Sequence, residues 1–200
     1  LILGTIQGLS EFLPISSNAH LKVIPMLIGW DDPGVSVSAV LQLGSIIAVI
    51  AYFRTDLQRI SRGFSLALIK GRWRETDSQL GIAIAIGTVP IILVGMWIKF
   101  FWPGYTDSIL RSIPSIGVIS ILMAVLLAFA ELVAKRVKDL NKVSGFDGLA
   151  IGIAQILALI PGVSRSGITL TASLLYGWKH YDGARFSFIL GIPAITIAGI

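Results

Sequence analysis

Long apolar segments alternate with short polar or basic segments along the whole chain. Residues 35–53, 79–97 and 113–134 are each long enough to cross a bilayer as a helix, which takes about 20 residues. A further apolar segment begins at residue 186 and runs to residue 200. The pattern predicts an all-α integral membrane protein, a polytopic helical bundle. Because both ends of the chain are apolar, we expect a piece of a longer protein.

Two other apolar segments are interrupted by prolines. Pro14 separates residues 1–13 from a second short helix at about 17–29, and Pro161 begins a turn between two further short segments. Each half is too short to span a bilayer. We therefore expect two re-entrant helix hairpins, 1–29 and 148–178, each buried by protein or facing a hydrated cavity.

The two interrupted segments resemble each other in sequence. The first contains Gly4-x-x-Gln7 and the second Gly152-x-x-Gln155, and a proline and a serine turn follow in both. Basic residues concentrate in 54–77 and 135–147, so the positive-inside rule predicts that these loops are cytoplasmic and that 30–34 and 99–112 lie outside. The hairpins then enter from opposite sides. We expect a single transmembrane domain, 1–200, with a first repeat at 1–134 and an inverted second repeat at 146–200.

Composition supports a membrane protein and excludes two other classes of site. Hydrophobic residues make up 54% of the chain and charged residues 14%, which is far from an ordinary soluble domain. The net charge of +5 does not indicate nucleic-acid binding, because the basic residues lie in short segments between spans and form no continuous face. Cysteine is absent, so disulfides and thiolate metal sites are excluded.

Polar side chains gather at the two turns. Arg165 lies between apolar segments, where an unpaired charge is costly. Its guanidinium stands among hydroxyls and glycines, which indicates an anion ligand, most simply a phosphate. Glu11 is an intramembrane carboxylate. It would need a hard cation such as Mg²⁺ to share that phosphate, or it would take part in proton transfer. Ser17 and His20 lie at i, i+3, as a nucleophile and its base would.

Each of these side chains also has a purely structural explanation. Ser16 or Ser17 would cap the second short helix, and His20 would be a hydrogen-bonded core histidine. Gln7 would be an interhelical polar contact. Lys22, near the outer end of its helix, would extend its charge to the membrane interface.

Two long motifs carry a resemblance to a known family. The first is Gln-Gly-Leu-Ser-Glu-Phe-Leu-Pro-Ile-Ser-Ser-Asn-Ala-His at 7–20, and the second is Pro-Gly-Val-Ser-Arg-Ser-Gly-Ile-Thr at 161–169. They resemble the acidic motif with its Ser-Ser-x-x-His, and the Pro-Gly-x-Ser-Arg-Ser-x-x-Thr signature, of the bacterial undecaprenyl-diphosphate phosphatases of the bacitracin-resistance type. The Leu41-Gln42-Leu-Gly-Ser run followed by Phe53-Arg54 also looks like this family. The resemblance covers the whole chain.

This resemblance implies an activity and a setting. The activity is hydrolysis of undecaprenyl diphosphate to undecaprenyl phosphate and inorganic phosphate, which recycles the lipid carrier for cell-wall synthesis and gives bacitracin resistance. The setting is the bacterial plasma (inner) membrane, with a multi-pass chain whose active site faces the outer, periplasmic side. The implied partners are a polyprenyl diphosphate lipid, the bilayer and a divalent cation, Mg²⁺ or Ca²⁺. The oligomeric state stays open, a homodimer included.

The resemblance also assigns roles to residues, position by position. Glu11, Ser17 and His20 fall on catalytic positions, and Glu11 and, more weakly, Gln7 fall on the metal-binding motif. Many members have Glu where this chain has Gln7, and an amide oxygen binds metal weakly and cannot act as a base at neutral pH. The substrate-binding positions are Arg165, Ser164, Ser166, Thr169, Gly162 and Ser16.

The route of the reaction and one alternative function stay open at this point. The attacking group would be Ser17, His20 or a water molecule. An inverted repeat with broken helices would also suit a lipid-phosphate flippase or a secondary transporter. The type 2 phosphatidic acid phosphatases are excluded as relatives, because Thr171 stands where that family has a histidine after its Ser-Arg pair.

Overall fold

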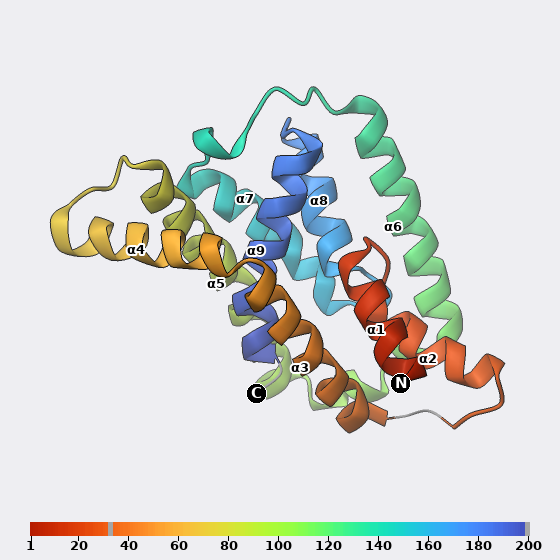
Figure 1. Ribbon diagram of the computed structural model, residues 1–200. Coiled ribbons are helices and arrows are strands. Elements are labelled where there is room, and N and C mark those ends of the chain that lie inside the picture. Colours follow the sequence, from red (N-terminus) through yellow and green to blue (C-terminus); the bar gives the residue numbers. More distant parts are fainter. Residues whose placement is uncertain (32–33, 199–200) are drawn as a thin grey trace.

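The computed structural model describes residues 1–31 and 34–198, and it is a helical bundle (Figure 1). Among these residues the only β-type pairing is an isolated bridge between Lys138 and Trp178. The all-α prediction is therefore confirmed. The helices are α1 (Ile2–Phe12), α2 (Ser17–Leu27), α3 (Gly34–Tyr52), α4 (Arg54–Lys70), α5 (Thr76–Phe101), α6 (Ile113–Val133), α7 (Gly145–Gln155), α8 (Arg165–Leu175) and α9 (His180–Ala198). Short 3-10 turns are η1 (Pro103–Asp107), η2 (Ile109–Arg111), η3 (Leu140–Lys142) and η4 (Ile156–Leu159).

Two helices of the described chain, α5 and α6, are long and apolar enough to cross a membrane. The bent pair α3 and α4 would make a third crossing if both helices formed one span. These helices contain the three spans expected from the sequence. The fourth expected span falls within α9, apart from residues 199–200, which lie outside the described residues, as do positions 32–33 of the expected outer turn 30–34.

Helix α4 replaces part of a predicted loop. The segment 54–77 is rich in basic residues, and we expected a cytoplasmic connection there. Its first 17 residues instead form a helix that leaves α3 at an angle of 74°. Ile60 and Ala67 on its inner face are buried, and the Ser78 hydroxyl of α5 donates to the Gly63 carbonyl at 2.8 Å. One apolar face is enough to hold the helix although five of its residues are charged.

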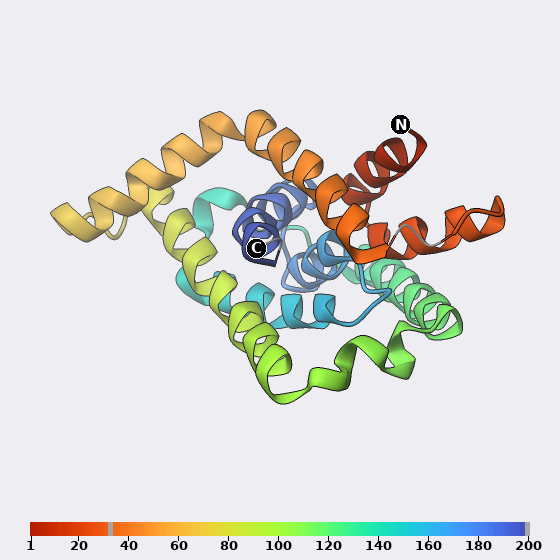
Figure 2. The same ribbon diagram turned by 90° about the horizontal axis from the view of Figure 1, so that it is seen from below.

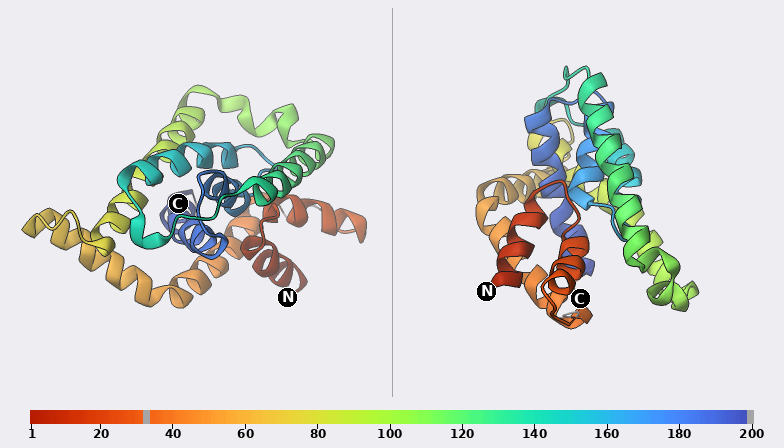
Figure 3. Two further views of the ribbon diagram at one scale, coloured as in Figure 1. Left: turned by 90° about the horizontal axis from the view of Figure 1, so that it is seen from above. Right: turned by 90° about the vertical axis from the view of Figure 1, so that its right-hand side faces the viewer.

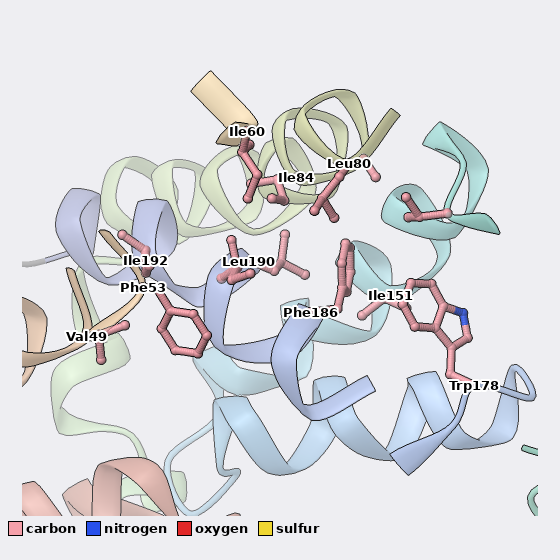
Figure 4. Close-up of a cluster of buried hydrophobic side chains, with 13 residues drawn as sticks. Val49, Phe53, Ile60, Leu80, Ile84, Ile151, Trp178, Phe186, Leu190 and Ile192 are labelled. Atoms are coloured by element: carbon pink, nitrogen blue, oxygen red, sulfur yellow. The ribbon is translucent and has the colours of Figure 1, made fainter. Parts of the chain in front are cut away.

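Helices α8 and α9 lie at the centre of the bundle, and the other helices surround them (Figure 2). The main buried cluster joins α9 to α3, α4, α5 and α7 (Figure 4). Phe186 and Leu190 of α9 are fully buried in it, beside Trp178 just before that helix. A central, apolar α9 gives the polar residues of α8 a fixed support.

Glycines let α5 and α7 pack with their backbones in contact. A Cβ on Gly152 would lie 2.3 Å from the Gly87 carbonyl oxygen, and one on Gly148 would lie 2.0 Å from the Ala83 carbonyl oxygen. Such distances leave no room for any side chain, so both positions require glycine. This tight contact fixes α7, and with it the turn that leads to α8.

The basic connections lie at one end of the bundle. The segment after α6 crosses over α8 and α9 at the upper end in Figure 1, and it is seen from above in Figure 3. The turn between α4 and α5 lies toward the same end, whereas η1, η2 and the start of α3 lie at the opposite end. This arrangement agrees with the predicted grouping of 135–147 with the end of 54–77, away from 99–112.

Candidate active site

The two proline-containing turns meet inside the bundle. The Ser166 hydroxyl in the first turn of α8 donates to the Leu13 carbonyl at the end of α1, at 3.2 Å. A Cβ on Gly167 would lie 3.1 Å from the Pro14 carbonyl oxygen. The start of α8 therefore packs against the tip of the α1–α2 hairpin, 153 positions earlier in the chain. The sequence analysis predicted functional side chains at both turns, and the structure brings the two turns into contact.

The helix that follows each turn begins with a serine N-cap. Ser16 caps α2 by accepting a hydrogen bond from the Ala19 amide, and Ser164 caps α8 by accepting one from the Gly167 amide. The structure thus selects Ser16 and not Ser17 as the N-cap of α2. The Ser17 hydroxyl is left to bond elsewhere.

Glu11 is the centre of the polar contacts at this meeting point. One oxygen, Oε1, accepts a hydrogen bond from Nη2 of Arg165 at 3.0 Å, which makes an ion pair between the two turns. The other, Oε2, accepts from the Ser17 hydroxyl at 2.8 Å and from the Gln7 amide at 3.2 Å. The side chains of Arg165 and Glu11 are only 15% and 9% exposed. The anion that Arg165 was expected to need is, in this structure, a carboxylate of the other hairpin.

The guanidinium of Arg165 fits against the backbone of α9. A Cβ on Gly191 would lie 1.2 Å from Nη1 of Arg165. No described residue hydrogen-bonds this buried nitrogen. Glycine at position 191 therefore makes the space that the arginine occupies. Nothing in the sequence linked Gly191 to Arg165, because the two lie on consecutive antiparallel helices and only the packing of α8 on α9 brings them together.

A cavity of about 200 Å³ opens at the Glu11–Arg165 pair. Both charged residues line it, together with Ser17 and the capping serines Ser16 and Ser164. A second cavity of about 430 Å³ adjoins the first, since the two share the lining residues Ser16, Asn18, Gln42, Ala158, Leu159 and Val163. A cation, a carboxylate and a hydroxyl thus face one cavity, an arrangement that would suit transfer of a phosphoryl group.

Gln7 is buried beside this cavity, and only one of the two polar atoms of its side-chain amide has a hydrogen-bond partner among the described residues. Its amide nitrogen donates to Glu11 and, at 3.4 Å, to the Ser45 hydroxyl of α3. Its carbonyl oxygen Oε1 has no hydrogen-bond partner among the described residues, although the side chain is 2% exposed. An unpaired amide oxygen next to a carboxylate is a donor set that suits a hard divalent cation. Within 1–31 and 34–198 no cluster of three His, Asp or Glu side chains could hold a metal alone, so a cation here would need oxygens from a bound ligand as well.

Three of the predicted site residues lie away from this centre. His20 is half-buried, and its Nδ1 is 2.7 Å from the Ser16 carbonyl oxygen, to which it donates; the ring is not among the residues that line either cavity. Thr169 is fully buried and donates to the Arg165 carbonyl within its own helix. Gly162 lines the second cavity, in a left-handed conformation with φ of 97°. The contact of Ser17 is therefore with Glu11, not with His20.

Two polar residues of α3 belong to the site and had no role in the sequence interpretation. Gln42 lines both cavities, and Ser45 bonds to Gln7. Both fall in the Leu41-Gln42-Leu-Gly-Ser run noted for its family resemblance. Their signal was the presence of polar side chains inside an otherwise apolar span, which usually marks a functional or interhelical position.

Comparison with known proteins gives one consistent result. The family model described as "Bacitracin resistance protein BacA" matches residues 1–200. The chain is 64% identical over 199 residues to an undecaprenyl-diphosphatase of Synechococcus sp. (strain CC9311), covering all of this chain and 70% of that protein. It is 66% identical over 201 residues to an undecaprenyl-diphosphatase of Parasynechococcus marenigrum (strain WH8102), again covering all of this chain and 70% of the relative. An undecaprenyl-diphosphatase of Prochlorococcus marinus (strain MIT 9303) is 64% identical over 200 residues, or 68% of its length.

Proposed function

The chain belongs to the bacitracin resistance protein BacA family, and from this premise we propose that it hydrolyses undecaprenyl diphosphate to undecaprenyl phosphate and inorganic phosphate. The observation that carries the proposal is the contact of Glu11 with both Arg165 and Ser17 at a cavity between two turns. A buried cation beside an activated hydroxyl is what cleavage of a phosphoanhydride needs.

Arg165 binds the terminal phosphoryl group and stabilises the charge that spreads over its oxygens during transfer. In the free protein Glu11 neutralises this guanidinium at 3.0 Å. A diphosphate entering the cavity competes with Glu11 for the same cation, because a guanidinium fork binds two oxygens at once. The carboxylate then turns from charge partner to proton acceptor.

Ser17 is the nucleophile in this proposal, and Glu11 is its base. The Ser17 hydroxyl already donates to Glu11 Oε2 at 2.8 Å. Ser17 Oγ bonds to the terminal phosphorus, its proton passes to Glu11, and the bond from that phosphorus to the bridging oxygen breaks, so undecaprenyl phosphate leaves. A water molecule then attacks the phosphoserine, giving inorganic phosphate and restoring the hydroxyl. His20 has no contact with Ser17 that would let it take this proton directly, which favours Glu11 over the imidazole.

A divalent cation, Mg²⁺ or Ca²⁺, would be held by Glu11 and the unpaired amide oxygen of Gln7. When bound, it supplies positive charge that neutralises the oxygens of the diphosphate. Gln7 itself is held in place by Glu11 and Ser45. Its own task is to present an uncharged oxygen ligand at a position where many members of the family have a second carboxylate.

We further propose that the α1–α2 segment and the segment from α7 to α8 are re-entrant hairpins of an inverted repeat in the plasma membrane, with the cavity open to the outer side. The second cavity supports this orientation, because Gly34 and Arg111 line it from segments that the positive-inside rule predicts to be outside. Charge-sensitive reporter fusions should report the segments 71–75 and 102–112 on opposite sides of the membrane. Reports of the same side would rule the arrangement out.

The test of the chemistry is to trap phosphate on the purified protein in detergent. We expect release of inorganic phosphate from the lipid diphosphate, and label from the terminal phosphate on Ser17. Label on His20 would identify the imidazole as nucleophile, and release with no labelled protein in a single turnover would favour direct attack by water. A flippase or a transporter, the alternative function, would release no phosphate, because it moves its substrate without breaking the phosphoanhydride bond.

A further inference from the structure

The second cavity is lined by two positively charged side chains that the proposed mechanism does not use. It adjoins the cavity of Glu11 and Arg165 and extends toward the start of α3 and the η2 turn. Two cationic side chains line it, Lys22 from α2 and Arg111 from η2, and none of its lining residues carries a carboxylate. Their neighbours in the lining include polar side chains that can donate hydrogen bonds, namely Ser16, Asn18, Ser38 and Gln42.

Lys22 and Arg111 are brought together although they are 89 positions apart. The Lys22 ammonium donates to the Arg111 carbonyl at 2.8 Å, so it is held at the cavity instead of extending freely into solvent. Both side chains are half-buried. Within the described part of the chain neither cation has an ion-pair partner.

Two neighbouring cations without a counter-charge are unfavourable to each other, and a bound anion relieves that repulsion. The lining suits a phosphate better than a carboxylate. A phosphate has several acceptor oxygens, and two cations together with surrounding amide and hydroxyl donors can bond to all of them. A metal ion is excluded from this cavity by the two positive charges.

We propose that Lys22 and Arg111 form a second phosphate-binding site, in the outer part of the active-site cavity. The proposal rests on the proposed hydrolysis for the source of its ligand, and two sources share this chemistry. One is the phosphate that stays attached to the lipid, in which case the pair positions the substrate. The other is the inorganic phosphate that leaves Arg165 after hydrolysis, in which case the pair receives the product on its way out.

The experiment compares the full chain in detergent with Arg111→Gln and with Lys22→Gln/Arg111→Gln. Arg111→Gln keeps the main-chain carbonyl that positions Lys22, so it removes a charge with the least disturbance of the fold. Lys99→Gln is the matched control, because Lys99 is an exposed cation at the same end of the bundle that lines neither cavity. Binding of radiolabelled inorganic phosphate is measured directly, and KM for the lipid diphosphate is measured on the same samples.

We expect the double variant either to bind inorganic phosphate at least tenfold more weakly or to have a KM for the lipid diphosphate raised at least tenfold. Arg111→Gln should change the same quantity in the same direction by about threefold. Weaker binding of inorganic phosphate with an unchanged KM identifies the product as ligand. A raised KM with unchanged binding of inorganic phosphate identifies the lipid-attached phosphate. The proposal is overturned if both quantities stay within twofold of the Lys99→Gln control. If the unaltered protein releases no phosphate, the proposed hydrolysis fails, and the binding of labelled phosphate still decides whether this site exists.

Discussion

The two segments that build the site share a local plan but differ in how deeply they are packed. Both consist of a short helix, a turn after a proline and an 11-residue helix capped by a serine. In α8 eight of the eleven residues are buried, whereas α1 and α2 bury two residues each. The same sequence signals therefore produced one segment inside the core and one segment against its side.

This difference in burial separates the segment that holds a residue in a fixed position from the segment whose side chains take part in the proposed reaction. The buried segment contributes Arg165, whose guanidinium is fixed against Gly191 and cannot move without cost. The less buried segment contributes the groups that must change partners or protonation during a reaction, Glu11 and Ser17. A cation held against the backbone of α9, opposite a carboxylate from a less buried segment, suits a site in which the substrate replaces that carboxylate. We therefore expect substitutions of the buried residues of α7 and α8, Arg165 excepted, to lower stability, and those of Glu11 and Ser17 to act mainly on activity.

The largest effect should come from the ion pair that joins the two segments. Arg165→Ala removes the charge that stabilises the transferred phosphoryl group and leaves Glu11 buried without its cation. We expect at least a 1000-fold loss of turnover, which corresponds to about 4 kcal/mol of transition-state stabilisation. Phosphate release measured in detergent checks this value.

Arg165→Lys is the control for charge alone. It should fold like the unaltered protein and remain strongly impaired, because an ammonium cannot bind two oxygens in a planar fork. A loss below tenfold in Arg165→Ala would contradict the role assigned to this residue.

The next effect tests whether the buried segment must hold the cation rigidly. Gly191→Ala places a methyl group where Nη1 of Arg165 lies. The guanidinium is the end of a flexible side chain, so it should move while the helices stay in place. We expect turnover to fall about 100-fold, or about 2.7 kcal/mol, with little change in the thermal unfolding midpoint. Gly117→Ala is the matched control, because a Cβ there meets nothing within 4 Å; equal activity of the two variants would show that the position of Arg165 is not fixed by α9.

Much of this arrangement could be predicted from sequence. The long apolar segments predicted the helices, and Pro14 and Pro161 predicted the two interruptions. The cost of a charge in an apolar setting pointed to Glu11 and Arg165. The helices are confirmed because they depend on local pattern. The roles of Glu11 and Arg165 stay predictions that depend on the general cost of burying a charge.

Other parts depended on packing that no local pattern contains. Helix α4 was predicted as a loop, since its charges hid one narrow apolar face. The spacing of Ser17 and His20 predicted a contact between them, but Ser16 takes the capping position and directs Ser17 to Glu11. The space at Gly191 is visible only once α8 lies against α9. Spacing along one helix predicts which residues share a face, not which partner a side chain reaches across the bundle.

A smaller effect, on stability alone, compares one glycine in each segment. Gly152→Ala forces a methyl group to within 2.3 Å of the Gly87 carbonyl oxygen, which is backbone and cannot give way unless α5 and α7 separate. We expect a loss of about 1–3 kcal/mol in stability, as for other overpacked cores. Gly8→Ala in α1 meets nothing within 4 Å and should stabilise its helix by about 0.5–1 kcal/mol. Thermal unfolding of the two purified variants should shift in opposite directions, and a shift of the same sign would remove the contrast in packing between the segments.

The smallest effect should come from the two serine caps. Each cap satisfies one backbone amide at a helix start, at 3.4 Å from Ser16 and at 3.1 Å from Ser164. Loss of such a cap costs about 0.5–2 kcal/mol. We expect Ser164→Ala to lie at the upper end of this range, because its hydroxyl also contacts Ser166 and eight residues of its helix are buried. Ser16→Ala should lie at the lower end, because α2 has few buried neighbours and its first turn can reach water. Thermal unfolding midpoints of the two variants show which cap contributes more to stability. Ser→Gly at each position is the control, because it restores solvent access to the freed amide. Equal losses at the two positions would mean that the hairpin of Glu11 and Ser17 is held as firmly as the helix of Arg165, and that the carboxylate is no more able to move than the cation it faces.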